Sequence, residues 1–402
     1  MAFTVLVLAT QVIGNLIPID QLAVYTTQLP SNDSSIRLGI VLADLDRGLS
    51  HILDSKSSLY AQPEGWSVDG KRLTFVDRDD IYVFSMADYR IHNVTLSSEY
   101  KDYYPTWSPD GKHIAFVASS NNPIGNGIQN NVGVLNVETG QAIYHSLEAM
   151  EYVTWRPVWS SDGNLIAFGT KLNGQTDQLK ILLVGEQALI PQFTLTEAAP
   201  SNPLWSPNGN WLAFESYRGD YLDENSPNYL ISRKKISIID GYKGNIRQII
   251  DDYENYAVWS PDGQSLAYTA WGRDSNPSYL ALHIVDIETE QERQLTPAGY
   301  NDSLPAWSPD GHSLAVISDR GGTPGTLYLV NTLTAERQPI VTINDHAQLP
   351  TWSSDGRWLA IYTIHYLDQN VGFPRIYIVD VSNHSIVSQL GEYQTNFIWQ
   401  PG

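Results

Sequence analysis

The chain has 402 residues, 42% of them hydrophobic and 17% charged, and its 12 Trp and 23 Tyr suit a strand-rich globular protein rather than a disordered one. Lys and Arg number 24 against 44 Asp and Glu, so the formal net charge is −20, which disfavours nucleic acid and anionic membranes as partners. The absence of Cys excludes disulfides, thiolate metal sites and cysteine nucleophiles.

The chain opens with an apolar stretch, residues 1–18, which contains no Lys or Arg and is interrupted by Thr, Gln and Asn. Two interpretations stay open: a strand or short helix packed on the domain, or the remnant of a targeting segment. No other segment is long and apolar enough to span a bilayer, so membrane insertion is not expected. We interpret residues 19–402 as one domain.

From residue 66 onwards the sequence repeats a ten-residue motif of the type "WSPDGQSLAY". Successive Trp residues are 41 to 54 positions apart, which is the length of one four-stranded blade of a β-propeller. Seven full copies and the start of an eighth begin at Trp66, Trp107, Trp159, Trp205, Trp259, Trp307, Trp352 and Trp399.

Each motif position has a local physical reason. The Ser hydroxyl can bond the backbone, Pro supplies a fixed φ, Asp tolerates the third turn position and Gly adopts the left-handed conformation, so the motif predicts a hairpin turn. The residues on both sides of the turn, and two later runs such as 81–86 and 91–96, read as strands. A four-stranded sheet cannot bury either face alone, and we expect the Trp to fill the gap between neighbouring sheets.

The two ends of the chain set the predicted number of blades. Before the first motif, residues 21–27, 37–45 and 49–54 read as three strands that lack a Trp strand of their own, and 395–400 would supply it. We therefore predict an all-β, eight-bladed β-propeller of four-stranded antiparallel blades, closed by pairing of the C-terminal strand with N-terminal strands. Seven blades with accessory N-terminal strands is the alternative.

The repeated W-S-P-D-G-x-x-[IL]-A-[FY] pattern resembles the WD40-like repeat of TolB-like β-propellers and of the propeller domains attached to prolyl oligopeptidases. The resemblance covers the chain from about residue 20. Departures from the pattern are small: Val68, Ser161 and Ser354 replace Pro, and Asn208 replaces Asp. The resemblance implies the propeller fold and, through TolB, a bacterial protein in a periplasmic or extracellular location.

Sequence motifs for catalysis are absent. The chain has no G-x-S-x-G nucleophile elbow, no H-E-x-x-H and no P-loop, which argues against a peptidase active site within it. Lyases acting on oligogalacturonate use a similar propeller with a histidine-rich metal site, and His346 and His365 are the weak metal candidates here, placed on loops that enter and leave strands of one blade. No third ligand is evident, so we expect hydrogen-bonded loop histidines and no catalytic residues.

Calcium is the one cofactor left open. The acidic runs at 44–48, 77–80 and 251–255 supply carboxylates, but none has the spacing of an EF-type loop. Solvated turns explain these runs more simply, and we expect no cofactor.

Binding residues are expected on one face of the ring. The predicted long loops 120–131, 216–235, 270–279 and 363–375, and the blade connectors 101–105, 151–157 and 254–258, carry aromatic residues beside charged ones, which is typical of recognition surfaces. Packing of these rings onto the propeller is the competing interpretation. The candidate binding residues are Tyr103, Tyr104, Trp155, Arg156, Tyr217, Arg218, Asp220, Tyr221, Asp223, Trp271, Arg273, Asp274 and Tyr366.

These features predict a monomeric, non-enzymatic scaffold that recognises a protein or peptide through an acidic and aromatic face. The alternatives are a carbohydrate-active enzyme of lyase or glycosidase type, or a sugar-binding propeller, acting at the channel mouth, and a sensor domain of a larger protein.

Overall fold

The computed structural model describes residues 22–29, 37–44, 49–53, 62–96, 100–121, 128–148, 150–172, 175–185, 188–195, 200–222, 230–253, 255–271, 279–297, 300–319, 325–343, 345–366, 372–390 and 397–401. The regular elements in these ranges are all β-strands, and none of them is a helix that could span a membrane. The apolar segment 1–18 lies outside them. The predicted all-β class is therefore confirmed.

The described strands form eight four-stranded antiparallel sheets, seven of which contain four consecutive strands. The first four of these seven comprise β4 (Gln62–Trp66), β5 (Arg72–Asp77), β6 (Asp80–Ser85), β7 (Arg90–Asn93); β8 (Lys101–Trp107), β9 (His113–Asn121), β10 (Ile128–Asn136), β11 (Ala142–Ser146); β12 (Glu151–Trp159), β13 (Leu165–Leu172), β14 (Asp177–Val184), β15 (Leu189–Leu195); β16 (Ser201–Trp205), β17 (Leu212–Leu222), β18 (Leu230–Ile239) and β19 (Ile246–Tyr253).

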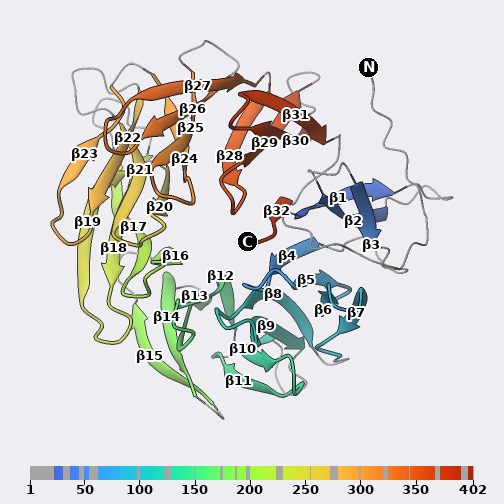
Figure 1. The fold of residues 1–402 in the computed structure, drawn as a ribbon. Coiled ribbons are helices and arrows are strands. Elements are labelled where there is room, and N and C mark those ends of the chain that lie inside the picture. Colours follow the sequence, from blue (N-terminus) through green and yellow to red (C-terminus); the bar gives the residue numbers. More distant parts are fainter. Residues whose placement is uncertain are drawn as a thin grey trace.

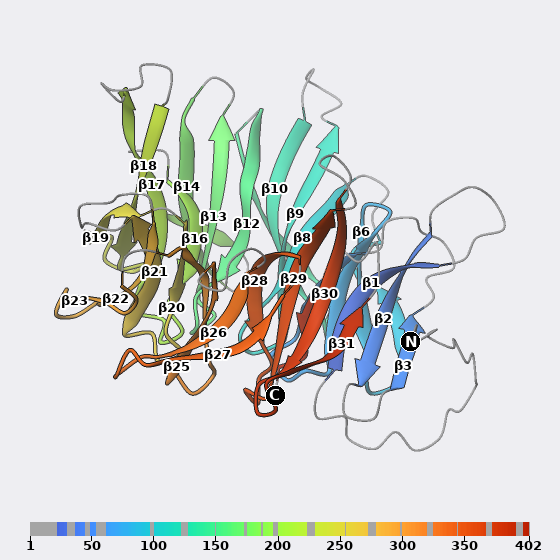
Figure 2. The ribbon, with the colours of Figure 1, turned by 90° about the horizontal axis from the view of Figure 1, so that it is seen from above.

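The next three sheets comprise β20 (Asn255–Trp259), β21 (Ser265–Trp271), β22 (Leu280–Asp286), β23 (Glu292–Gln294); β24 (Asp302–Trp307), β25 (Ser313–Ser318), β26 (Thr326–Asn331), β27 (Arg337–Thr342); β28 (His346–Trp352), β29 (Trp358–Tyr366), β30 (Gly372–Asp380) and β31 (Ser385–Leu390). Figure 1 shows the sheets around a common centre, with the motif strand of each sheet innermost, and Figure 2 shows the ring from a second direction. We call these eight motif strands, β4, β8, β12, β16, β20, β24, β28 and β32, the inner strands.

The remaining sheet joins the two ends of the chain. It contains β1 (Leu22–Leu29), β2 (Arg37–Asp44), β3 (Leu49–Leu53) and β32 (Phe397–Trp399), in the order β3-β2-β1-β32. Trp399 lies opposite Ala23 in the β32–β1 pair, as the sequence predicts. One face of this sheet packs against Trp66 and its neighbours, and the other packs against Trp358 and the strands around it.

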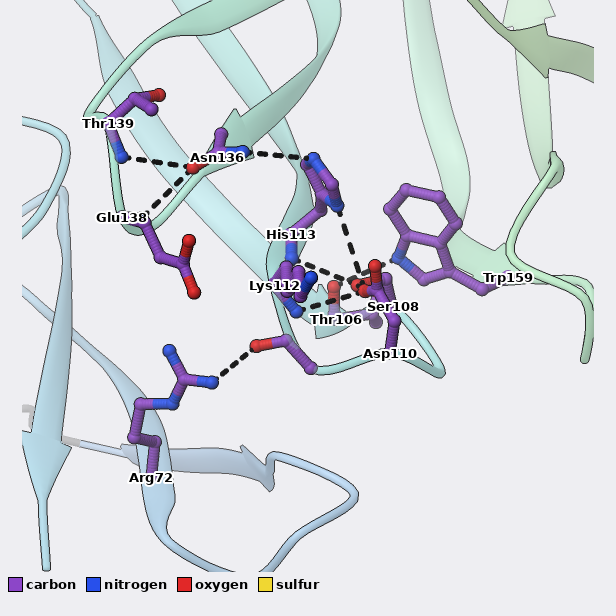
Figure 3. Close-up of polar contacts among 11 residues, drawn as sticks. Arg72, Thr106, Ser108, Asp110, Lys112, His113, Asn136, Glu138, Thr139 and Trp159 are labelled. Atoms are coloured by element: carbon purple, nitrogen blue, oxygen red, sulfur yellow. Dashed lines mark hydrogen bonds and ion pairs between the residues drawn. The ribbon is translucent and has the colours of Figure 1, made fainter.

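The Ser-Pro-Asp-Gly turns are held by a repeated set of hydrogen bonds, shown for one copy in Figure 3. The Asp110 carboxylate accepts bonds from the Ser108 hydroxyl and from the Lys112 N–H at 2.9 Å, and Ser108 Oγ accepts the His113 N–H at 2.9 Å. Gly111 has φ +67°, the left-handed conformation predicted for the fourth position. The Ser and the Asp therefore bond one another as well as the backbone, so the turn depends on both side chains.

The motif tryptophans do more than fill gaps between sheets. The Trp159 indole N–H donates to the carbonyl of Thr106, the residue just before the tryptophan of the preceding sheet, at 3.1 Å (Figure 3). The same bond, 2.9–3.2 Å long, is made by seven motif tryptophans: Trp107, Trp159, Trp205, Trp259, Trp307, Trp352 and Trp399. Trp66 follows the junction with the β3-β2-β1-β32 sheet, and its buried Nε1 has no partner in the described structure. The ring is thus joined sheet to sheet by one bond type, interrupted at one place.

Removing residues 395–402 should lower the melting temperature by about 10 °C or more, because it deletes β32 and with it the buried Trp399. It also deletes the Gln400 side chain, which bonds the Gly70 carbonyl at 2.5 Å. Differential scanning calorimetry measures the shift. Trp399→Phe is the control, since it keeps most of the ring packing and removes the bond to Thr351, and should cost about 1–2 kcal/mol. An unchanged melting temperature after truncation would contradict closure of the ring by β32.

The turns should make stability depend on acid pH. Bonds from the Ser308 hydroxyl and the His312 N–H hold the pKa of Asp310 below its usual value. At Asp69, Asp110 and Asp162 burial raises the pKa, but the bonds from the turn serine and a following backbone N–H outweigh it, so these pKa values are lowered too. A carboxyl whose pKa is lower in the folded chain stabilises it above the unfolded value of about 3.9 and loses that contribution as pH falls through the folded value.

Replacing these four aspartates by Asn should therefore flatten the fall in melting temperature below about pH 4. The folded state should persist at neutral pH, because Asn208 already occupies the equivalent position of one turn and accepts the Ser206 hydroxyl at 2.8 Å. An equally steep acid transition in the variant would show that other carboxylates control it.

Candidate functional site

Three neighbouring inner strands present one cluster of side chains, and β-bulges place them there. In β4 the pairing skips from Pro63 to Gly65, which leaves Glu64 in the bulge. In β8 it skips from Tyr103 to Thr106, with Tyr104 between them at φ 57°. In β12 it skips from Trp155 to Val158, with Arg156 between them. A bulged residue leaves the ladder and its side chain is re-aimed, so three strands of different sheets can direct side chains to one place.

The three bulged side chains meet across two sheet boundaries. Arg156 Nη2 lies 3.0 Å from Glu64 Oε2, although the two residues are 92 positions apart in sequence. The guanidinium carbon lies 5.7 Å from the centre of the Tyr104 ring, within the range of a cation–π contact. The Tyr103 ring meets the Tyr104 ring edge to face at 4.9 Å. We call Glu64, Tyr103, Tyr104 and Arg156 the inner-strand cluster.

The cluster is unequally exposed. The Arg156 side chain is 46% exposed and the Glu64 side chain 12%, so the carboxylate is largely covered while the guanidinium reaches solvent. Burial raises the pKa of Glu64, and the charge and hydrogen bond of Arg156 oppose that rise. Tyr103 is less accessible: its hydroxyl lies 3.3 Å from Asn130 Oδ1, and burial raises its pKa. The cluster can therefore hold an ionic or polar group against an aromatic surface.

Trp155 lies beside Arg156 in the chain and is 39% exposed. Its Cα partner in the next strand is Gly169, where an added Cβ would clash with the indole ring and with the side chain of Thr154. The glycine thus leaves the space that the Trp155 ring occupies, and the ring is supported by the backbone of β13.

A second polar cluster surrounds Asp345, which is 5% exposed and precedes β28. Its carboxylate accepts a bond from the Tyr377 hydroxyl at 2.7 Å and lies 2.6 Å from His365 Nδ1 and 3.5 Å from Arg375 Nη1. Burial would raise the pKa of Asp345, but these three partners lower it. The carboxylate orients His365, whose side chain is 30% exposed.

His346 and His365 differ from the prediction in one respect. Both belong to strands, β28 and β29, rather than to loops, because each strand continues beyond the expected boundary. His346 pairs with Ile364, one position before His365. The His346 side chain lies outside the described side chains, and within those that are described no three His, Asp or Glu groups gather as a metal site would require.

Most candidate binding residues also lie on strands rather than on loops. Tyr103, Tyr104, Trp155 and Arg156 were expected on connectors between blades, but they belong to the inner strands β8 and β12. The expected loop 216–235 is largely a hairpin extension, in which Tyr221 of β17 pairs with Ile231 of β18. Alternating aromatic and branched residues on both sides of it supply the strand pairing.

The remaining candidates are placed only in part. Tyr217, Arg218, Asp220 and Tyr221 lie on β17, Trp271 on β21 and Tyr366 on β29, with side chains that are not described. Asp223, Arg273 and Asp274 lie outside the described residues.

Sequence analysis missed Glu64 and Asp345, which complete the two clusters. Glu64 sits in "PEGW", where a charged residue two positions before the motif Trp departs from the Pro or Ala found there in the six later full copies. That departure was a usable signal. Asp345 belongs to an ordinary turn sequence, "NDH", and carried none.

Comparisons with known proteins follow this geometry. Residues 220–401 match the family described as TolB beta propeller domain. The uncharacterized peptidase YuxL of Bacillus subtilis (strain 168) is 40% identical over 63 residues, which are 16% of this chain and 9% of that protein.

Two solved structures share the fold. Dipeptidyl peptidase 4 of Porphyromonas gingivalis superposes with a TM-score of 0.61 at 13% identity, covering 90% of this chain and 56% of that one. An oligogalacturonate lyase in complex with manganese superposes with a TM-score of 0.54 at 14% identity, covering 91% of this chain and 98% of that one. The chain therefore spans only part of the peptidases it matches.

These comparisons confirm the predicted resemblance to TolB-like repeats and correct the predicted function. A non-enzymatic scaffold is contradicted, because a peptidase is among the sequence relatives and a peptidase and a lyase are among the structures that share the fold. The error arose from treating the lack of a catalytic motif in the propeller as evidence about the whole activity. The comparisons indicate the propeller domain of an enzyme.

Gly169→Ala should displace the Trp155 ring and cost about 1–3 kcal/mol of unfolding free energy, because a methyl group would enter space that the indole fills. Urea unfolding measures the loss. In a Trp155→Ala background the same glycine change should cost less, since most of the clash is gone. Equal losses in both backgrounds would show that the ring does not depend on the glycine.

Proposed function

We propose that this TolB-like β-propeller is the part of a peptide-processing enzyme that binds the peptide, with the bond-breaking groups supplied by a separate domain or chain. The peptidases among its relatives support this assignment. The absence of a nucleophile elbow from the sequence supports the division of labour. The observation that carries the proposal is the inner-strand cluster, where an exposed cation and an exposed aromatic ring meet at the centre of the ring of sheets.

The inner strands suit an extended peptide for a further reason. Each is the edge strand of its sheet, so one side of its backbone is not used by its own sheet. Edge strands accept an added peptide through main-chain hydrogen bonds, while side chains select the sequence. The bulges of β4, β8 and β12 set Glu64, Tyr104 and Arg156 beside those edges.

We also propose that the eight sheets are eight blades of one closed ring. The packing of the β3-β2-β1-β32 sheet on both its neighbours and the repeated tryptophan bond support this count. By the resemblance to TolB we infer a monomer in a periplasmic or extracellular location, with a protein or peptide as its partner.

One observation favours a second function, a lyase acting on an acidic sugar chain. Buried Asp345 holds His365 by Nδ1, the arrangement that in metal sites directs the other ring nitrogen to a metal. The lyase structure that shares the fold contains manganese and is matched over 98% of its length. Native mass spectrometry with added Mn²⁺ tests this alternative: one bound ion, lost in His365→Ala, would favour the lyase, and no binding would dismiss it.

Tyr104→Asn should weaken peptide binding about tenfold while leaving stability nearly unchanged, because Asn tolerates the positive φ of Tyr104 and already stands at the equivalent position 202 with φ 50°. Fluorescence anisotropy with a labelled tryptic digest of casein measures the affinity.

The matched control is Tyr89→Asn. Tyr89 also has a positive φ, 56°, and is 42% exposed against 37% for Tyr104, but it lies between the outer strands β6 and β7. Equal effects of the two changes, or no binding of the digest by the unaltered chain, would contradict the proposal.

A further inference from the structure

The charge that a ligand can reach in the inner-strand cluster is the cation. Arg156 is 46% exposed, whereas its partner Glu64 is 12% exposed. A guanidinium carries five N–H donors, and Glu64 engages Nη2 of this one. The aromatic ring of Tyr104 supports one region of the group without using those donors. Arg156 can therefore offer donors to an incoming acceptor while it remains held in position.

Arg156 is also unusual among the inner strands. Apart from His346, their only other basic residue is Lys101, which is 67% exposed and lies 3.1 Å from Asp79. A planar guanidinium binds a carboxylate through two parallel hydrogen bonds, which makes Arg the side chain best suited to recognise that group. The centre of the ring thus presents one available guanidinium on strands that are otherwise mostly aromatic, apolar or amide-bearing.

The net charge of −20 does not prevent such recognition. At physiological ionic strength the repulsion from distant carboxylates is screened beyond about 8 Å, whereas a direct contact with Arg156 is not. The acidic surface would slow the approach of an anionic peptide, but the contact itself would decide which peptide stays bound.

Glu64 occupies the position that a ligand carboxylate would take. Burial already raises the pKa of Glu64, and Arg156 is the charged group that opposes the rise; Tyr103 and Tyr104 are the other titratable groups of the cluster. A ligand that engages Arg156 would remove this opposition, and Glu64 would then take a proton from solvent instead of remaining as a buried, unpaired anion.

We propose that Arg156 binds a carboxylate of the peptide by exchanging it for Glu64, which is released from the ion pair and becomes protonated. The inference rests on the proposed function, because it names the chemical group that the peptide-binding site selects. The carboxylate can belong to the C-terminus of the peptide or to an Asp or Glu side chain, since both present the same two oxygens.

Four labelled peptides of one neutral, Tyr- and Pro-containing sequence test the inference. They carry either a free or an amidated C-terminus, and either Glu or Gln at one internal position. A peptide with a carboxylate in the accepted place should bind about tenfold more tightly than the peptide with none. The arm that shows the gain identifies the source as the C-terminus or the side chain.

Variants of the ion pair separate recognition from structure. Arg156→Met should remove the preference for the carboxylate while leaving the weaker binding of the neutral peptide, and Arg156→Lys should keep part of the preference. Glu64→Gln should bind the acidic peptide at least as tightly as the unaltered chain, because no carboxylate has to be displaced. If Arg156→Met does not fold, the Lys and Gln variants still decide the outcome.

Proton uptake provides a readout that a merely structural ion pair would not change. Calorimetry at one pH in buffers of different ionisation enthalpy should show protons taken up when the acidic peptide binds, and Glu64→Gln should abolish the uptake. Equal binding of all four peptides, still weakened by Tyr104→Asn, would overturn the inference and leave the proposed function intact. No binding of any peptide would overturn the proposed function itself.

Discussion

The structure depends on one contact between neighbouring sheets, the bond from a motif tryptophan to the backbone of the sheet before it. The indole ring fills the space between two sheets, and its N–H satisfies a carbonyl at the edge of an inner strand. A buried tryptophan without that partner would leave a polar group unsatisfied, so the bond fixes the position of each sheet as well as the distance between sheets. The inner strands, and the cluster they carry, take their positions from this arrangement.

The bulges then convert a regular scaffold into a specific site. The motif Trp has to stay in register with its turn, and the residues just before it absorb the irregularity. At most inner strands that place is occupied by small, apolar or amide side chains, but at β4, β8 and β12 it is occupied by Glu64, Tyr104 and Arg156. The same backbone irregularity therefore serves packing in most of the ring and recognition in one part of it.

The sequence allowed the turns, the strand class and the pairing of the chain ends to be predicted, because each depends on local residue chemistry repeated many times. It misplaced Tyr104 and Arg156 onto connectors, since a bulge breaks the alternation by which a strand is recognised. It missed Glu64 because the partner that gives it a role is 92 positions away, and nothing in "PEGW" indicates which distant strand will approach. Asp345 escaped for the same reason: three partners, Tyr377, His365 and Arg375, come from strands that follow it.

The uniform tryptophan bond has a consequence for how such a chain can change over generations. Each copy of the motif acts as donor to the copy before it and as acceptor for the copy after it, so a duplicated or deleted copy would find the same partners on both sides. The motif by itself therefore carries no record of how many copies the ring should contain. That information resides at the junction where Trp66 lacks a carbonyl and the two chain ends share a sheet, and a gain or loss of copies would have to be accommodated there.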